Sequence, residues 1–112
     1  MKNGSYGIIY SAYNIYTNKY YIGQTTGTLK KRMNGHMSDC KRRNYPFHNS
    51  LNKYGIDAFK WEVIGSASDK HLLDELEIMF IDVYNSLSPK GYNLTKGGKR
   101  LADGARLVTP GD

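Results

Sequence analysis

The 112 residues are enough for one domain with a modest hydrophobic core. Hydrophobic residues make up 39% and charged residues 23%, which indicates a globular chain and excludes a disordered one. The formal net charge of +6 and the pI of about 9.4 favour a polyanionic partner such as nucleic acid, although a merely solvated basic surface would have the same composition.

Cys40 is the only cysteine, which excludes an internal disulfide and a zinc site built from cysteines. We therefore expect a reducing, cytoplasmic setting. The first residues do not have the pattern of a signal peptide, and no apolar run is long enough to span a membrane. A membrane partner is not expected.

A β hairpin is predicted near the start of the chain. Residues 7–13 and 19–24 are rich in β-branched and aromatic side chains, as strands are. Residues 14–18 between them have asparagine at both ends, which is typical of a turn. We expect Gly23 to let the chain leave the sheet.

Two helices should follow the hairpin. Thr28 is placed to cap a first helix that begins at Leu29 and ends in the basic run 41–44. A second, shorter helix over residues 47–54 follows a proline and should stop at Gly55. At about 100° per residue, the first helix has one apolar face, formed by Leu29, Met33, Met37 and Cys40.

A third strand and a long helix complete the predicted fold. The alternating residues 59–65 indicate the strand, and Ser68 is the expected cap of the helix after it. This helix should bury a stripe of six apolar residues, namely Leu72, Leu73, Leu76, Met79, Phe80 and Val83. Residues 88–91 form a turn, and residues 96–112 are a basic, glycine-containing linker or tail, which leaves residues 1–95 as the folded domain. The elements predict an α/β protein of the α+β type, in which a small, mostly antiparallel three-stranded sheet is flanked by helices and the strands lie on one side of them.

Four residues of the hairpin and the first helix are candidates for chemistry. Tyr10 and Tyr21 lie in the paired strands, where tyrosines often serve cross-strand packing alone. Arg32 and His36 are one helical turn apart and share a side of the helix. On the helical wheel His36 falls roughly 55° and Arg32 roughly 95° from the centre of the apolar face. There a guanidinium can bind a phosphate and a histidine can share its proton network, but a histidine at the edge of a core has the same position.

The long helix offers two carboxylates. Glu75 and Glu77 each lie roughly 100° from the centre of the apolar stripe, on opposite edges, so the helical period does not choose between them. Either could face a cleft beside the sheet, and either could be solvated. His48, His71 and Cys40 have no common zinc spacing. A single carboxylate with water molecules would suit magnesium.

Six short segments form a pattern when they are taken in order. They are Gly7-Ile8-Ile9-Tyr10, Tyr21-Ile22-Gly23-Gln24-Thr25, Leu29-Lys30-Lys31-Arg32 with His36, Asn52-Lys53-Tyr54-Gly55, Glu77-Ile78-Met79-Phe80-Ile81 and Gly91-Tyr92-Asn93. The pattern resembles the GIY-YIG nuclease family from about Tyr6 to Gly98. The first motif departs slightly, since Ile9 stands between Ile8 and Tyr10. The similarity looks greatest to the homing endonucleases of phages and bacteria, in which such a domain commonly precedes a linker and a separate DNA-binding region.

The resemblance implies a metal-dependent DNA endonuclease that hydrolyses phosphodiester bonds with one Mg²⁺ or Mn²⁺ ion. Glu77, rather than Glu75, takes the place of the metal-binding glutamate. Arg32 resembles the arginine that contacts the scissile phosphate, and Tyr10 resembles the candidate general base. Because a tyrosine has an ordinary pKa of about 10, Tyr10 would need positive charge nearby, from Arg32, the metal ion or His36. The other implied site residues are Tyr21, which orders water and phosphate, His36, which joins the proton network, and Asn93, which supports the site.

Double-stranded DNA is the expected partner, with a further DNA-binding domain beyond the C-terminal linker. The residues expected to contact phosphates are Lys30, Lys31, Lys41, Arg42 and Arg43. The alternatives are a restriction or repair nuclease of the same fold, a catalytically silent DNA-binding module, and a protein-interaction domain with an incidental basic face. A polar set beside the core argues against the silent module, which would not need Tyr10, Arg32, Glu77 and Asn93.

Overall fold

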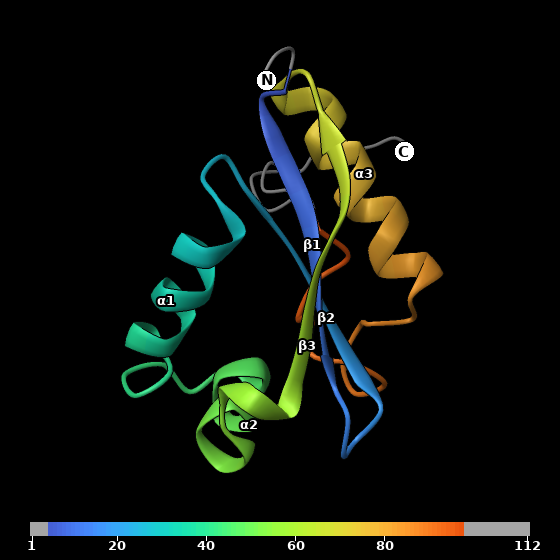
Figure 1. Ribbon diagram of the computed structural model, residues 1–112. Helices are drawn as coiled ribbons and strands as arrows, with labels where there is room; N and C mark the ends of the chain where they lie inside the picture. The colour runs from blue at the N-terminus through green and yellow to red at the C-terminus, as the bar shows by residue number, and fades with distance from the viewer. Residues whose placement is uncertain (1–4, 98–112) are drawn as a thin grey trace.

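A three-stranded antiparallel sheet lies at the centre of the molecule, with helices on both of its faces (Figure 1). The computed structural model describes residues 5–97. Its elements in chain order are β1 (Gly7–Asn14), β2 (Lys19–Thr25), α1 (Leu29–Asp39), α2 (Pro46–Tyr54), the 3₁₀ helix η1 (Ile56–Ala58), β3 (Phe59–Ala67) and α3 (Lys70–Val83). β1 is the middle strand, so β2 and β3 are the edges. The predicted hairpin, third strand and helices are confirmed.

The two faces of the sheet carry separate hydrophobic cores. Ile9 of β1 packs with Leu73 and Ile81 beneath α3. Ala12, on the opposite face of the same strand, packs with Phe47 of α2. The expectation that the strands lie on one side of all the helices was therefore wrong. β1 is the central strand and buries side chains on both faces, so it can be covered from two sides.

Helix α3 begins one residue later than predicted and turns a different face to the sheet. Its cap is Asp69 rather than Ser68, and the Asp69 carboxylate accepts a hydrogen bond from the backbone N–H of Leu72 at 2.8 Å. Leu73 is buried as predicted. The exposed members of the predicted stripe are Leu72, Met79 and Val83. Strands are only about 4.8 Å apart, so three of them are too narrow to cover so wide a stripe.

The chain after α3 returns to the edge of strand β2. The backbone N–H of Tyr92 donates to the carbonyl of Tyr20 at 2.9 Å. The side chain of Asn93 pairs with the backbone of Ile22 through both of its polar atoms, at 2.9 and 2.8 Å. Asn93 also forms a parallel bridge with Leu87. These contacts tie the free edge of β2 in place.

None of the helices within residues 5–97 has the length and hydrophobicity needed to cross a lipid bilayer. The predicted linker or tail, residues 96–112, lies outside the described residues apart from its first two. The described part of the chain contains the sheet, the helices and the cavity on which a function can be argued.

Candidate active site

Tyr10 and Gly23 occupy opposite positions on the paired strands β1 and β2. Tyr10 is fully buried, and a Cβ atom at Gly23 would collide with its ring and hydroxyl. The prediction that the chain leaves the sheet at Gly23 was wrong, because β2 continues past this glycine to Thr25. Its missing side chain instead makes room for the Tyr10 ring to lie across the neighbouring strand.

Helix α1 turns a histidine toward this tyrosine. His36 is the buried residue of the helix, whereas Leu29, Met33 and Met37 of the predicted apolar face are only half-buried. The periodicity had placed His36 at the edge of the core. The structure places its ring inside, where Nε2 lies 2.7 Å from the hydroxyl oxygen of Tyr10. A buried polar group is stable when it has such a partner.

A second histidine extends this contact. His36 Nδ1 lies 3.1 Å from Nε2 of His48, which helix α2 supplies. Tyr10, His36 and His48 therefore form an unbroken row of hydrogen-bonding groups, with exposed fractions of 0%, 2% and 6%. Within residues 5–97, the remaining ring nitrogen of His48, Nδ1, is buried and has no hydrogen-bond partner. No role for His48 follows from the sequence, because the two histidines are brought together by the packing of α1 against α2.

Aromatic rings surround the row and keep it dry. The rings of Tyr21 and Phe47 are stacked 4.1 Å apart. His36 meets both of them edge-on, at 5.5 and 4.9 Å. Trp61 of β3 lies 6.3 Å from the Tyr10 ring. Such packing fixes the ring planes and lowers the local dielectric, which disfavours charge on any of these groups.

Burial accordingly shifts the titration of the row toward neutral forms. Burial raises the pKa of Tyr10 well above its ordinary value, although Arg32 acts in the opposite direction. Burial, with a smaller contribution from the Arg32 charge, lowers the pKa of His36 to about 3. Burial also lowers the pKa of His48. At neutral pH Tyr10 is protonated and His36 is uncharged, so the expectation that His36 could supply positive charge to Tyr10 was wrong.

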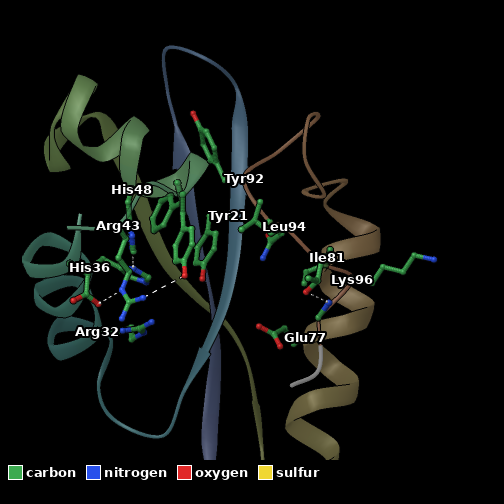
Figure 2. A pocket seen from close by; sticks show the side chains of 16 residues that line it. Tyr21, Arg32, His36, Arg43, His48, Glu77, Ile81, Tyr92, Leu94 and Lys96 are labelled. Atoms are coloured by element: carbon green, nitrogen blue, oxygen red, sulfur yellow. Dashed lines mark hydrogen bonds and ion pairs between the residues drawn. The ribbon is translucent and has the colours of Figure 1, made fainter. Parts of the chain in front are cut away.

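A cavity of about 760 Å³ curves around the edge of strand β2 (Figure 2). Tyr21, Arg32 and His36 line it from the side of α1, and Glu77 lines it from α3, on the other side of the strand. Tyr10 lies behind this wall, without exposed surface. Five of the six predicted site residues therefore line one cavity, namely Tyr21, Arg32, His36, Glu77 and Asn93.

The two glutamates of α3 that periodicity left undecided differ in their surroundings. Glu77 is half-buried and lines the cavity, where its carboxylate accepts a hydrogen bond from the Gln24 amide at 2.9 Å. The same amide nitrogen donates to the carboxylate of Asp74 at 2.8 Å. Glu75 points into solvent, where it lies 3.2 Å from the equally exposed His71.

The carboxylates beside the cavity suit a hard cation. Asp74 is almost fully buried, and Lys70 contacts it at 3.0 Å. Among the described residues no three His, Cys, Asp or Glu side chains gather as a metal cage. A magnesium ion that keeps much of its hydration shell needs only one or two such oxygen ligands, and Glu77 offers one at the cavity wall. The sequence reading missed Asp74, although its spacing of three from Glu77 places both on one helical face.

The predicted phosphate-binding residues are exposed and lie on α1 and in the loop that follows it. Arg43 lines the cavity and lies 3.5 Å from the hydroxyl of Tyr45. Arg42 is paired with Asp39 at 2.7 Å, and Arg43 lies 3.9 Å from the same carboxylate. Hydrogen bonding to Arg42 lowers the pKa of Asp39. The others, Lys30, Lys31 and Lys41, are exposed.

The family model for the GIY-YIG catalytic domain matches residues 6–93. The chain belongs to the GIY-YIG family. The match includes every strand and helix of the structure and all the predicted site residues. It confirms the family and the α+β fold that the six segments indicated.

Individual relatives agree with this assignment. The MSV199 domain-containing protein 146R of Invertebrate iridescent virus 6 is 36% identical over 94 residues, which are 79% of this chain and 38% of the viral protein. This GIY-YIG chain thus spans less than half the length of that relative. The catalytic domain of the homing endonuclease I-TevI matches with a TM-score of 0.67 and 27% identity, covering 80% of this chain and 98% of that domain. A mutant of the same domain, described as that of an intron endonuclease, matches with a TM-score of 0.71 and 26% identity, covering 82% and 96%.

Proposed function

We propose that this GIY-YIG domain is a DNA endonuclease that hydrolyses phosphodiester bonds and requires one divalent ion, Mg²⁺ or Mn²⁺. The observation that carries the proposal is the cavity around strand β2, because it is lined by Arg32 on one side and by Glu77 on the other. A phosphodiester in this cavity would meet a permanent positive charge and a carboxylate able to hold a metal ion. Both are needed to neutralise the charge of a phosphoryl group in its transition state.

Arg32 would bind the scissile phosphate. Its guanidinium is always charged and can donate two parallel hydrogen bonds to phosphoryl oxygens. Glu77 would hold the metal ion, with Asp74 and Gln24 fixing the position of its carboxylate. Once bound, the ion would act as a Lewis acid on the phosphate and stabilise the leaving oxygen.

Tyr21 is better placed than Tyr10 to meet the attacking water, because Tyr21 lines the cavity and Tyr10 does not reach it. Burial raises the pKa of Tyr21, and the nearby charge of Arg32 works against that rise. Tyr21 would therefore take a proton from the water as it passes one to Tyr10. The two tyrosines would act as a pair, and the products would be a 5′-phosphate and a 3′-hydroxyl.

We further propose that the domain is the catalytic part of a homing endonuclease that acts on double-stranded DNA. The likeness to the I-TevI catalytic domain supports this role. A separate DNA-binding domain beyond the C-terminal linker would then select the target. The basic residues beside the cavity would bind phosphates without regard to sequence.

Incubation with supercoiled plasmid tests the proposal. We expect nicked or linear products with Mg²⁺ or Mn²⁺, and none with EDTA. Protein should be raised to high concentration, so that weak DNA binding by the isolated domain does not hide cleavage. Equal cleavage in EDTA would overturn the metal requirement. Binding without cleavage at every metal and protein concentration would identify a silent DNA-binding module instead.

A further inference from the structure

The row formed by Tyr10, His36 and His48 connects two parts of the cavity wall. At one end the ring of Tyr10 lies 6.3 Å, between centroids, from the ring of Tyr21, which lines the cavity. At the other end is His48, which also lines the cavity and whose Nδ1 is the partnerless nitrogen. A buried ring nitrogen with no partner is costly in a folded protein, and a persistent one calls for a functional reason. Figure 2 shows His48 and His36 linked on the α1 side of β2, away from Glu77.

We propose that His48 is the exit of a proton relay that begins at Tyr21 and runs through Tyr10 and His36. The inference rests on the proposed function, in which a water molecule loses a proton in the cavity. His48 does not contact the substrate in this scheme, and it acts through His36. Tyr10, which receives a proton from Tyr21, has no exposed surface, so it passes its own proton to His36 and not directly to solvent.

The two contacts set the order of the transfers. In the proposed resting arrangement the Tyr10 hydroxyl donates to His36 Nε2, 2.7 Å away. The neutral His36 ring then carries its hydrogen on Nδ1 and donates to His48 Nε2 at 3.1 Å. His48 then carries its hydrogen on Nδ1. As Tyr21 passes a proton to Tyr10, Tyr10 passes its own to His36 and His36 passes one to His48. The Nδ1 hydrogen of His48 then leaves to a water molecule that approaches this buried nitrogen from the cavity that His48 lines. Each group gains one proton and loses one.

This concerted route avoids charge on any buried group. The low pKa of His36 means that it cannot store the proton as an imidazolium, so a relay that ended at His36 would stop there. With His48 in line, both imidazoles only exchange one neutral tautomer for the other. The charged groups around His48 are Arg32 and Asp39 of α1 and Arg43 of the following loop. Only the Asp39 carboxylate can receive the departing proton, through water, because the two guanidinium groups are already fully protonated.

Nuclear magnetic resonance of the ring nitrogens tests the resting arrangement without reference to catalysis. We expect ¹⁵N shifts of the neutral Nδ1–H tautomer for both His36 and His48 at pH 7. The Nε2–H tautomer at either buried ring would overturn the proposed order of donors.

The use of the relay is tested by chemical rescue. His48→Ala should lower the single-turnover cleavage rate by roughly tenfold to a hundredfold, within or below the usual contribution of a positioned acid or base. Imidazole added in solution should restore part of that rate, because the truncation leaves space beside the cavity. Ser50→Ala is the matched control, since Ser50 is also a buried residue of α2 and contacts Asn14 and Tyr92 rather than the relay. It should lower the melting temperature, and imidazole should not change its cleavage rate.

The outcomes separate the relay from the function on which it rests. If wild-type protein cuts DNA and His48→Ala cuts equally fast, the relay is wrong and the nuclease stands. If His48→Ala is slow but does not respond to imidazole, and melts as low as Ser50→Ala, His48 is only a packing residue. If the wild-type protein does not cut under any condition, the proposed function fails, and the relay has no reaction to serve.

Discussion

The two sides of strand β2 carry opposite kinds of chemistry. On the α1 side, Tyr10, His36 and His48 are buried among aromatic rings, and burial favours their neutral forms. On the α3 side, the carboxylates of Asp74 and Glu77 are matched by an amide and an ammonium group. The single strand β2 therefore separates buried neutral groups that are suited to proton transfer from charged side chains that are suited to binding a metal ion. A hydrolytic site needs both, and β2 lets both face one cavity.

The largest test of this contrast is a pair of substitutions on α3. Glu77→Ala should remove a metal ligand and raise the activation free energy of cleavage by several kcal/mol. The single-turnover rate should then fall on the order of a thousandfold or more. Glu75→Ala should cut nearly normally, because Glu75 only meets the exposed His71. Both variants should unfold within about half a kcal/mol of the wild type. Near wild-type cleavage by Glu77→Ala would show that Glu77 does not hold a metal ion that cleavage requires.

The neutral state of His36 on the α1 side can be tested by lowering the pH. His36 has a pKa of about 3 in the folded protein and an ordinary pKa of about 6.5 in the unfolded chain. As the pH falls below about 6.5, the unfolded chain binds a proton that the folded protein does not, so the free energy of unfolding decreases until the pH reaches about 3. From pH 7 to pH 5 we expect a loss of about 2 kcal/mol in the free energy of unfolding. His36→Asn should lose less over this interval, and His71→Ala should follow the wild type. Urea unfolding at the two pH values measures the free energy of unfolding. Equal losses of that free energy in the wild type and in His36→Asn would show that His36 is not held neutral.

On the α3 side, Gln24 holds the two carboxylates together, because its amide nitrogen donates to both Asp74 and Glu77. Gln24→Leu should weaken Mn²⁺ binding by roughly tenfold, as losses of groups that orient metal ligands do. Thr25→Ala on the same strand is the control, since its hydroxyl accepts from the backbone N–H of Gly27 and contacts neither carboxylate within residues 5–97. Calorimetric titration with Mn²⁺ gives both affinities, and identical values would mean that Gln24 does not position Glu77.

The smallest effect separates two neighbouring arginines on the α1 side. Arg43 lines the cavity, whereas Arg42 is engaged by Asp39 at 2.7 Å. Arg43→Ala should weaken DNA binding by roughly threefold to tenfold at low salt and reduce the salt slope by about one. Arg42→Ala should have the smaller effect, because its charge is already partly neutralised. Fluorescence anisotropy across a salt series measures the DNA affinity of both variants. A larger loss of affinity in Arg42→Ala than in Arg43→Ala would show that the DNA phosphates lie outside the cavity.

Much of the fold could be predicted because its signals are local. The hairpin follows from strand-forming residues on either side of an asparagine-bounded turn, and Thr28 caps α1 as predicted, accepting from Lys31. The exposed face of α3 was misjudged for a reason that is not local. Apolar periodicity gives the width of a stripe, but the width of the sheet beneath it decides how much of that stripe is covered.

The candidate site divides in the same way. Motif order was sufficient to name Tyr21, Arg32, Glu77 and Asn93, which line the cavity. It could not find His48 or Asp74. Their importance comes from contacts across 12 residues to His36 and 50 residues to Gln24.

The sequence by itself determined the order of strands and helices, the basic charge and the family, because these depend on residue type and spacing along the chain. Only the tertiary structure decided which groups are charged. His36 lies at the margin of a helical wheel, and its neighbour Arg32 accounts for only the smaller part of the shift that lowers its pKa to about 3. The larger part comes from the dry aromatic packing of Tyr21, Phe47 and Trp61, which the folding of β2, α2 and β3 around one helix brings together. Desolvation is a property of that enclosure, so it exists only after the chain has folded.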